Sequence, residues 1–283
     1  MTKEFLLPIY EVIFKLLFGD ERNKDILTDF LKSVLKVPHE EYDEITISDP
    51  HLIREFPDDK LGILDVKLKL KSGRVVNIEI QLATMKAFKQ RMMFYNARMI
   101  TEQIGDSEQY EQINPVVNIV ITNHTLIAES NSYHHHFRLA DLEKQVIFSD
   151  LTEIHTLELP KLSFSQDEKP LMAWMKFFNV KSKEELDMVV QEYPQMQRTA
   201  TKYLEITQDD RNRAMHEARV KQRRDMQAHF EAMVDAMVGE VEKKSRNEER
   251  TSIAKNMLAL GLSPEIISQS SGLSIEEIGC IDD

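Results

Sequence analysis

Two acidic side chains, Asp65 and Glu79, stand at polar positions of two neighbouring segments in which polar and apolar residues alternate. The stretch ILDVKLKLKSGRVVNIEIQ, residues 63–81, predicts two β-strands joined by a turn at Lys-Ser-Gly. Gln81 follows Glu79 at a spacing of two and therefore points to the same side of its strand. Carboxylates that meet on one face of a hairpin either lie in water or hold a divalent cation such as Mg²⁺.

The length of the turn decides whether the two acids meet. A two-residue turn would place Asp65 opposite Ile80 and would mix the polar and apolar faces of the hairpin. A three-residue loop with Gly73 in the left-handed conformation places Asp65 opposite Glu79 and keeps the faces separate. Like charges directly across a ladder destabilise the strand pair. We therefore expect a lysine, water or a divalent cation beside the two carboxylates.

Whether other elements cover the polar face of the hairpin decides if its acids form a functional site or a solvated surface. Its lysines, Lys67 and Lys69, could contact phosphate or act as counter-charges for the acids. An exposed hairpin carries such residues for solubility alone. The apolar run at 116–121 and its flanking helices indicate instead a sheet that is covered on both faces. Partly covered acids are unfavourable unless something pairs with them, which favours a site.

The elements that must position these residues follow from hydrophobic spacing. Three- and four-residue spacing predicts helices, and alternation or a short apolar run predicts strands. The predicted helices cover 9–18, 22–36 and 85–103, and the strands on either side of the hairpin cover 42–50 and 114–123. The resulting order is α-α-β-β-β-α-β. Residues 131–160 predict two or three weaker strands, and almost everything after Pro170 predicts helix.

An apolar seam within the charged C-terminal stretch leaves two interpretations open. Its members recur at spacings of four, three and four, and they are Met226, Phe230, Met233 and Met237. Such a seam fits packing against the chain's own helices, and it also fits contact between two copies of the chain. It spans about two heptads, which is short for a coiled coil.

The segments GLSPEII and GLSIEEI, at 261–267 and 272–278, form a small internal repeat. Each predicts a short helix, with Ser263 or Ser274 as the N-cap residue. Two short helices separated by a glycine resemble a helix-turn-helix. The two segments carry no basic face that could contact DNA. They therefore fit a packing or assembly motif as well as a DNA-binding motif.

Composition narrows the class of protein. The 283 residues include 42% hydrophobic residues, which is enough for a sizeable core, and the net charge is −12. Binding to nucleic acid would then need a local basic patch or metal ions. The single cysteine, Cys280, excludes an internal disulfide. With neither a signal peptide nor an apolar run long enough to span a membrane in the sequence, we expect a cytoplasmic protein without membrane contact.

The stretch SYHHHFRL raises the question of a second metal site. Consecutive histidines on a strand point to alternate faces, so only His134 and His136 converge. The sequence offers no evident third ligand, and an ordinary exposed strand is the favoured interpretation.

The chain resembles the PD-(D/E)XK nuclease-family transposases, also called recombination-promoting nucleases. The stretches that carry the resemblance are EVIFKLLFGDERNKDILTDFLKSVL, DDKLGILDVKLKLKSGRVVNIEIQ, FKQRMMFYNARM, YEQINPVVNIVI and EIHTLELPKL, within residues 9–162. The C-terminal AKNMLALGLSPEIISQSSGLSIEEI also looks like a tail often seen in this family.

The resemblance implies a fold and a chemistry. The fold is a restriction-endonuclease-like αβββαβ core, an α/β fold with a mixed sheet flanked by helices and a helical C-terminal extension. We expect the nuclease-like core at 1–165, the helical extension at 166–250 and a short helical hairpin tail at 251–283. The implied activity is Mg²⁺-dependent cleavage of DNA in transposition, recombination or defence, with Mn²⁺ as a substitute.

The resemblance also assigns roles to residues. Asp65 matches the metal-binding aspartate, Glu79 the acidic position of the signature and Gln81 the position that is lysine in the wider superfamily. A metal ion would be held by Asp65, Glu79 and the Ile80 carbonyl, and Glu11 matches an acidic position that could complete its ligands. The DNA phosphates would meet Arg91 and Tyr95, which match the family's R-x-x-x-Y pattern; Lys67, from its place on the polar face of the hairpin and not from the resemblance, is a further candidate for a phosphate contact. Tyr95 also fits a core aromatic.

Three interpretations of function therefore remain. The first is a metal-dependent DNA endonuclease. The second is a catalytically weak or inactive DNA-binding or assembly protein on the same fold, because Gln81 replaces a positive charge with a neutral amide. The third is an interaction protein whose helical tail, including a homodimer contact through the C-terminal helices, is the working part.

Overall fold

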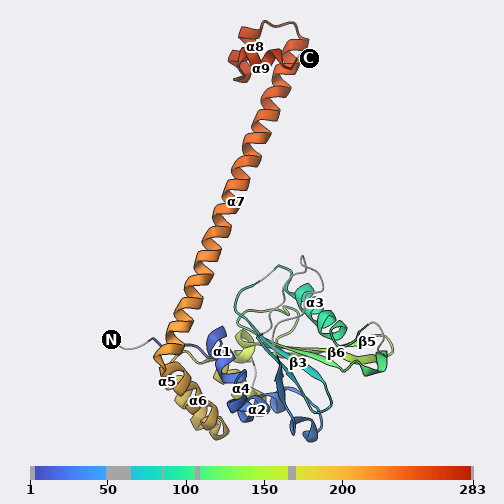
Figure 1. Cartoon of the computed structure of the whole chain (residues 1–283), viewed down its shortest axis with the longest axis vertical. Helices are drawn as coiled ribbons and strands as arrows, with labels where there is room; N and C mark the ends of the chain where they lie inside the picture. The colour runs from blue at the N-terminus through green and yellow to red at the C-terminus, as the bar shows by residue number, and fades with distance from the viewer. Residues whose placement is uncertain (1–3, 49–64, 85, 106–108, 165–169, 282–283) are drawn as a thin grey trace. The chain divides into compact units, whose positions relative to one another are not determined.

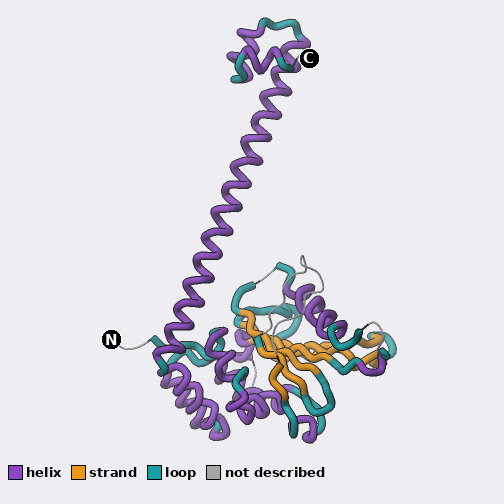
Figure 2. Tube along the Cα trace, viewed as in Figure 1, coloured by secondary structure: helices purple, strands orange, loops and turns teal. Residues whose placement is uncertain are grey.

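The structure, a computed structural model, describes residues 4–48, 65–84, 86–105, 109–164 and 170–281. Within these residues one mixed sheet forms in the order β1-β2-β3-β4-β6-β5 (Figures 1 and 2). β3, β4 and β6 run parallel to one another, and the remaining neighbours are antiparallel. The strands are β1 Thr46–Ser48, β2 Val66–Lys69, β3 Val75–Gln81, β4 Val116–Thr122, β5 His134–Asp141 and β6 Val146–Glu158.

The helices lie where hydrophobic spacing predicts them, with shorter bounds. They are α1 Glu11–Phe18, α2 Lys24–Val34, α3 Phe88–Thr101, α4 Pro170–Asn179, α5 Lys183–Glu192, α6 Gln197–Gln208, α7 Asp210–Ala259, α8 Pro264–Ser271 and α9 Ile275–Gly279. Short 3₁₀ segments occur at Glu21–Asn23, His39–Tyr42, Tyr110–Gln112, Leu159–Phe164 and Pro194–Met196. The order α-α-β-β-β-α-β up to β4, and with it an α/β fold, is confirmed.

Helices cover both faces of the sheet (Figure 1). On one face α1, α2 and α4 pack against alternate residues of the central strands, such as Ile78, Ile119 and Leu157, in the main hydrophobic core. On the other face α3 packs through Met92 and Met99. The central β4 is buried along its whole length, as the apolar run predicts. Asp65 and Glu79 therefore stand on a covered sheet.

Aromatic side chains fill the core between the sheet and the first helices. Phe18, Phe30, Trp174 and Phe178 are almost completely buried, and their rings contact one another. The indole Nε1 of Trp174 donates to Asp29 at 3.0 Å. Each such ring contributes about 2–3 kcal/mol of apolar burial. This cluster fixes α1 and α2, and α1 in turn carries Glu11.

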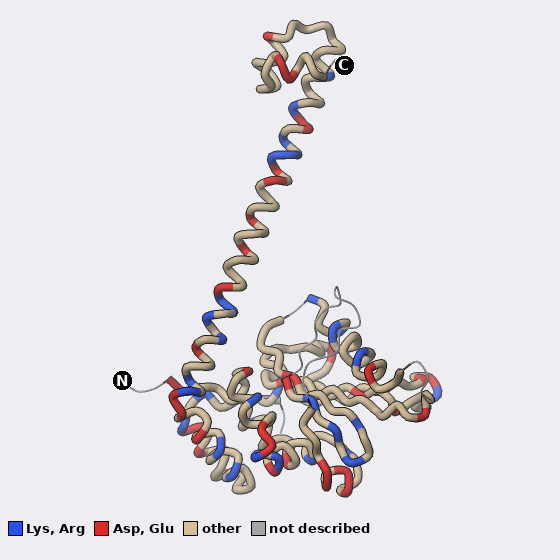
Figure 3. The backbone as a smooth tube through the Cα atoms, in the orientation of Figure 1, with Lys and Arg blue, Asp and Glu red and all other residues tan. Residues whose placement is uncertain are grey.

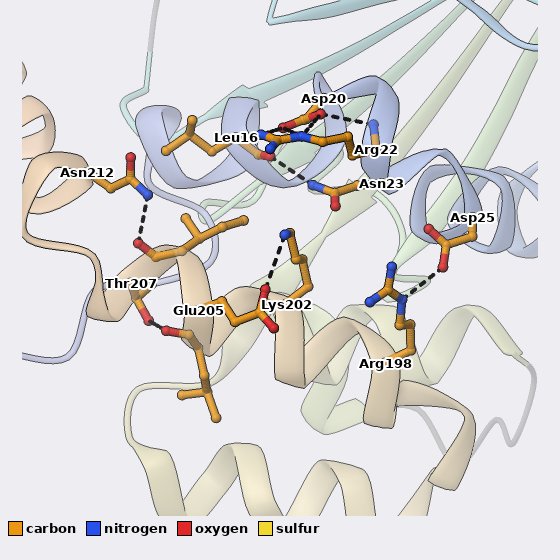
Figure 4. Close-up of polar contacts among 12 residues, drawn as sticks. Leu16, Asp20, Arg22, Asn23, Asp25, Arg198, Lys202, Glu205, Thr207 and Asn212 are labelled. Atoms are coloured by element: carbon orange, nitrogen blue, oxygen red, sulfur yellow. Dashed lines mark hydrogen bonds and ion pairs between the residues drawn. The ribbon is translucent and has the colours of Figure 1, made fainter.

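The last helix of this core closes back on the first helices. Arg198 of α6 donates to Asp25 of α2 at 3.0 Å, a contact between residues 173 positions apart (Figure 4). The hydroxyl of Tyr203, also on α6, donates to the carbonyl of Leu6. Residues 170–208 therefore pack with the N-terminal helices and do not form a separate unit.

One predicted element differs from the structure. Among the two or three weaker strands that residues 131–160 predict are VIFSDL and EIHTLELP, but these two segments contribute to one strand, β6 of 13 residues. No glycine or proline interrupts residues 146–158. The pairing with β5 is nevertheless irregular, because the neighbouring residues Arg138 and Leu139 of β5 pair with Glu153 and Ser149, and the register skips residues 150–152 of β6.

By its contacts the chain divides into two compact units, Met1–Glu217 and Ala218–Asp283. The second unit contains most of α7, from Ala218 onward, and the end of this helix packs with α8 and α9 around Ala254, Ile267, Leu273 and Ile278. Ser274 caps α9 in a capping box with Glu277, whereas Ser263 precedes α8 without a side-chain cap bond. The division at 165 and 250 stays a prediction.

The long helix α7 is charged along its length, with acidic and basic residues interspersed (Figure 3). Its predicted apolar seam is exposed to solvent in the single chain. The exposed fractions are 66% for Met226, 58% for Phe230, 47% for Met233 and 59% for Met237. Packing of the seam against the chain's own helices is therefore not observed in the described residues.

A bilayer-spanning helix was not expected from the sequence. None of the helices in the described part of the chain combines the length and the apolar character that crossing a membrane requires.

Candidate functional site

The hairpin has the register that the face pattern predicts. Gly73 adopts φ +89°, and its N–H donates to the carbonyl of Leu70 at 2.9 Å, which closes a three-residue loop. Val66 pairs with Ile78 across the ladder. Continuing this register by one residue would place Asp65 opposite Glu79, in agreement with the face pattern of the sequence, and the charge of Asp65 raises the pKa of Glu79.

Asp65 lies at the edge of the ladder and is partly buried, with 13% of its side chain exposed. Its Oδ2 accepts a hydrogen bond of 2.8 Å from the N–H of Ile80. Its Oδ1 lies 3.4 Å from the ammonium of Lys15 on α1. Burial raises the pKa of Asp65, and the bond from Ile80 and the charge of Lys15 oppose this. The carboxylate is therefore held by contacts from two elements.

The backbone of β3 also faces Asp65. The carbonyl of Arg74 accepts from Leu70 on the β2 side, and residues two apart in a strand direct their backbone groups to the same side. The N–H of Ile80, six residues beyond Arg74, follows this rule by donating to Asp65. The Ile80 carbonyl, the predicted metal ligand, accordingly lies along the same edge of β3.

Glu79 is more buried than Asp65, with 3% of its side chain exposed. Its Oε1 accepts from Arg91 at 2.7 Å, whereas its Oε2 has no hydrogen-bond partner in the described residues. Burial raises the pKa of Glu79 to about 7, the charge of Arg91 opposes this and the charge of Asp65 adds to it. A buried carboxylate oxygen without a partner fits a position that a cation completes.

Arg91 links this acid to the helix above it. Its Nε donates to the hydroxyl of Tyr95 one turn along α3, at 3.1 Å, and its guanidinium lies 5.1 Å from the centre of that ring. Tyr95 packs against both apolar clusters beneath α3. The two interpretations of Tyr95 are therefore compatible, because one ring is a core aromatic and also orients Arg91.

Glu11 and Lys15 bring a second helix to the site. They lie one turn apart on α1, and the Lys15 ammonium is 3.2 Å from the Glu11 carboxylate. The charge of Glu11 raises the pKa of Asp65, so the two acids interact. Sequence reasoning missed Lys15, although its spacing of four from Glu11 was a usable signal. Asp65, Glu79, Glu11, Lys15 and Arg91 are called the acid-pair site below.

Two other predicted site residues have local partners. Gln81 is buried, and its Nε2 donates to the carbonyl of Ala83 at 2.5 Å. Because the amide group is planar, this bond also fixes the direction of Oε1. Lys67 pairs with Glu102 at the end of α3, at 3.1 Å. The sequence left open whether Lys67 contacts phosphate or balances the charge of Asp65 and Glu79. The structure adds a third role, because the Lys67 ammonium pairs with Glu102 directly after α3.

Sequence reasoning also missed a chain of buried amides beside Glu79. Asn77 donates to Asn118 at 2.6 Å, Asn118 donates to Asn96, and Asn96 donates to Thr152 at 2.7 Å. The chain links β3, β4, α3 and β6 beneath the acid-pair site. A hydrogen bond that involves Asn77 lowers the pKa of Glu79. The asparagine within the apolar run VVNIVI was the signal for it.

The comparisons with known proteins bear on this geometry. The family model for PD-(D/E)XK nuclease family transposases matches residues 8–233 of the chain. The match contains the whole acid-pair site and extends through the helices up to α7. Comparisons with curated proteins and with solved structures found no match. Since the family match spans most of the 283 residues, the chain belongs to the PD-(D/E)XK nuclease family transposases.

Proposed function

We propose that the chain is a metal-dependent DNA endonuclease that hydrolyses phosphodiester bonds, with Mg²⁺ as its cofactor and Mn²⁺ as a substitute. The observation that carries the proposal is the buried Oε2 of Glu79, which has no partner in the described residues and stands across a ladder from Asp65. Membership in the family supports a nuclease-like or transposase function. A role in transposition, recombination or defence fits the same chemistry.

The residues that would hold the ion are Asp65, Glu79 and the Ile80 carbonyl, with Glu11 as an additional ligand. Oxygen donors of this kind suit Mg²⁺. When bound, the ion supplies positive charge to the scissile phosphate and lowers the pKa of a water molecule. Asp65 is oriented for this role by the Ile80 N–H, and the Glu79 carboxylate by Arg91.

Lys15 provides the positive charge that Gln81 lacks. Its ammonium lies 3.4 Å from Asp65 and belongs to a different element from the signature position. A cation there favours the anionic form of Asp65 and would stabilise negative charge that develops on the phosphate. Gln81, whose amide nitrogen is fixed by Ala83, would orient water through Oε1.

Arg91 and Tyr95 would contact the DNA backbone from α3. Arg91 keeps 30% of its side chain exposed while it pairs with Glu79, so its guanidinium reaches both the acid and the surface. A guanidinium suits a phosphate because it offers several donors in one plane. Lys67 is the more weakly supported contact, since it pairs with Glu102.

A catalytically weak or inactive DNA-binding or assembly protein is the second candidate function. The observation that favours it is Gln81, a neutral and buried amide engaged by Ala83 at the position where the signature has lysine. In this candidate the acids would keep their structural contacts, and DNA would be bound without being cut.

Assembly into a homodimer through α7 belongs to the same proposal. The exposed apolar seam continues four residues beyond Met237 with Val241, which is 67% exposed. Side chains at three- and four-residue spacing on a helix bury one another when a second copy of that helix packs alongside.

The experiment that separates the two candidate functions measures cutting and binding side by side. Supercoiled plasmid is incubated with the protein in Mg²⁺, Mn²⁺ or EDTA, and binding to a labelled duplex is followed by mobility shift in Ca²⁺. Nicking that requires Mg²⁺ or Mn²⁺ supports the endonuclease. A mobility shift without nicking in any metal would contradict the endonuclease and support the second candidate.

A further inference from the structure

A second cluster of metal-ligating side chains lies on the β5–β6 pair. His136 of β5 stands directly opposite His155 of β6, and Glu153 lies two residues before His155 on the same face. One ligand atom from each of these three residues lies within 4.8 Å of the others. Thr152, of opposite parity in β6, bonds to Asn96 of α3. The cluster therefore occupies the face of the sheet opposite α3, away from the pair between Glu79 and Arg91.

Two of the three separations between ligand atoms in this cluster are close to those of a metal centre, and the shorter one is a hydrogen bond in the metal-free protein. Glu153 Oε2 lies 3.0 Å from His136 Nε2 and 3.7 Å from His155 Nε2. In a tetrahedral zinc site, ligand bonds of about 2.0–2.2 Å place neighbouring donor atoms about 3.3 Å apart. The two observed separations lie on either side of this value.

His155 supplies the independent observation. Its side chain is 4% exposed, and its Nε2 has no hydrogen-bond partner within 3.5 Å in the described part of the chain; the Glu153 carboxylate faces it at 3.7 Å, and this interaction with His155 is the main cause that lowers the pKa of Glu153. Its other ring nitrogen, Nδ1, shares a hydrogen bond of 2.9 Å with His134 Nε2. A histidine that ligates a metal is typically oriented in this way, with one nitrogen bonded to a neighbour and the other directed to the ion.

The carboxylate of Glu153 divides its two oxygens between two kinds of partner. Oε1 lies 3.4 Å from Arg74 and 3.9 Å from Arg138. Oε2 faces His136 and His155. The arginines thus fix the carboxylate through one oxygen, and the other oxygen remains directed at the two imidazoles.

We propose that His136, Glu153 and His155 form a site for a transition-metal dication of the Zn²⁺ class, separate from the acid-pair site. Imidazole nitrogens select such ions over Mg²⁺, which prefers oxygen ligands. Two histidines and one glutamate form a donor set of the kind that leaves a fourth position open. His136 and Glu153 line a cavity of about 780 Å³, which gives an ion and a fourth ligand access.

Binding requires one imidazole to turn. The rings of His136 and His155 are stacked, with centroids 4.2 Å apart and planes inclined by 13°, whereas a bound ion lies close to the plane of each ring that ligates it. His155 is fixed by burial and by His134. His136, with 36% of its side chain exposed, is the ring that rotates.

The test is zinc binding by the full-length, untagged protein after removal of metal with EDTA and dialysis. Calorimetric titration with Zn²⁺ should give about one tight site per chain, and bound Co²⁺ should show the visible absorption of a low-coordinate centre. His136→Ala and Glu153→Gln should each weaken binding about tenfold or more. His136 is exposed, so its variant should keep the wild-type circular dichroism spectrum.

Two controls make the outcome decisive. His135 lies on the same strand but is directed to the opposite face, 3.4 Å from Glu158, so His135→Ala should bind Zn²⁺ like the wild type. Asp65→Asn, which alters the acid-pair site, should also bind Zn²⁺ normally. Absence of binding by the wild type, or binding lost in Asp65→Asn and retained in His136→Ala, would overturn the proposal. Neither result depends on whether the chain cuts DNA.

Discussion

Glu79 is a buried carboxylate with a raised pKa, and it is also a proposed ligand of the metal ion. A carboxylate that is 3% exposed is unfavourable in its ionised form, and Arg91 compensates for only one of its oxygens. Its pKa of about 7 in the folded protein lies above the ordinary value of 4.5. The metal-free folded protein therefore binds more protons than the unfolded chain between these two pH values. The stability from Glu79 is complete below pH 4.5 and is lost as pH rises through 7.

The first prediction concerns this pH dependence in EDTA. Glu79→Gln removes the titration, so its free energy of unfolding relative to the wild type should increase between pH 4.5 and 8, by on the order of 3 kcal/mol. Urea unfolding at several pH values measures the difference. The variant Glu143→Gln, at an exposed acid of the β5–β6 turn, should follow the wild-type curve. Parallel curves for Glu79→Gln and the wild type would show that Glu79 is ionised normally.

The second prediction concerns Lys15 and depends on the proposed nuclease activity. Replacing its ammonium in Lys15→Met should lower the cleavage rate by about 10²-fold, because a preorganised charge beside Asp65 is lost. Lys15→Arg should retain more of the rate, since the positive charge remains. Lys24→Met, at a lysine of α2 paired with Glu21, is the matched control. Equal rates for Lys15→Met and the wild type would remove Lys15 from the site.

At the scale of elements, the hairpin of β2 and β3 was predictable because its register follows from local rules. Alternation sets the faces, and the glycine at the third loop position selects the loop. Lys15, the buried amides and the pairing of Glu153 with His136 were not predictable in the same way. They depend on which elements meet in space, and a single sequence without a structure does not determine that. The merging of two expected strands into β6 shows the same limit, since the pairing with β5 decides it.

The third prediction concerns the loop that sets the register. Gly73→Ala should destabilise the protein by about 1–3 kcal/mol, because φ is +89° and a new Cβ would lie 2.7 Å from the side chain of Asn114. Gly239→Ala, within α7 where no atom lies within 4 Å of the added Cβ, should be neutral or slightly stabilising. Thermal unfolding compares the two variants. An unchanged midpoint for Gly73→Ala would contradict the left-handed loop.

At the scale of the whole molecule, the net charge affects the proposed binding to DNA, and the exposed seam of α7 affects the proposed association of two copies. A net charge of −12 opposes approach to DNA, so under the proposed function the cations near the acid-pair site and a metal ion held there would have to provide the local attraction. The seam is a row of large apolar side chains exposed to water, which is unusual for a helix that acts alone. A second copy of the helix is the partner we propose for it.

The fourth prediction tests that partner. The wild type should have twice the monomer mass in light scattering coupled to size exclusion, and Phe230→Glu should have the monomer mass, because a charge in the seam cannot be buried. Ala228→Glu, on the helix face opposite the seam, is the control and should leave the mass unchanged. A wild type that stays monomeric at high concentration would contradict the dimer.

The most direct test of the central claim is the initial rate of plasmid nicking in Mg²⁺ by the wild type, Asp65→Asn and Glu79→Gln, compared at equal concentrations of folded protein. The account predicts nicking by the wild type that EDTA abolishes, and a loss of about 10²-fold or more in each variant, because each removes one charge that holds the metal. Glu143→Gln should cut at the wild-type rate. Metal-dependent nicking that persists at the wild-type rate in both Asp65→Asn and Glu79→Gln would contradict the assignment of the site.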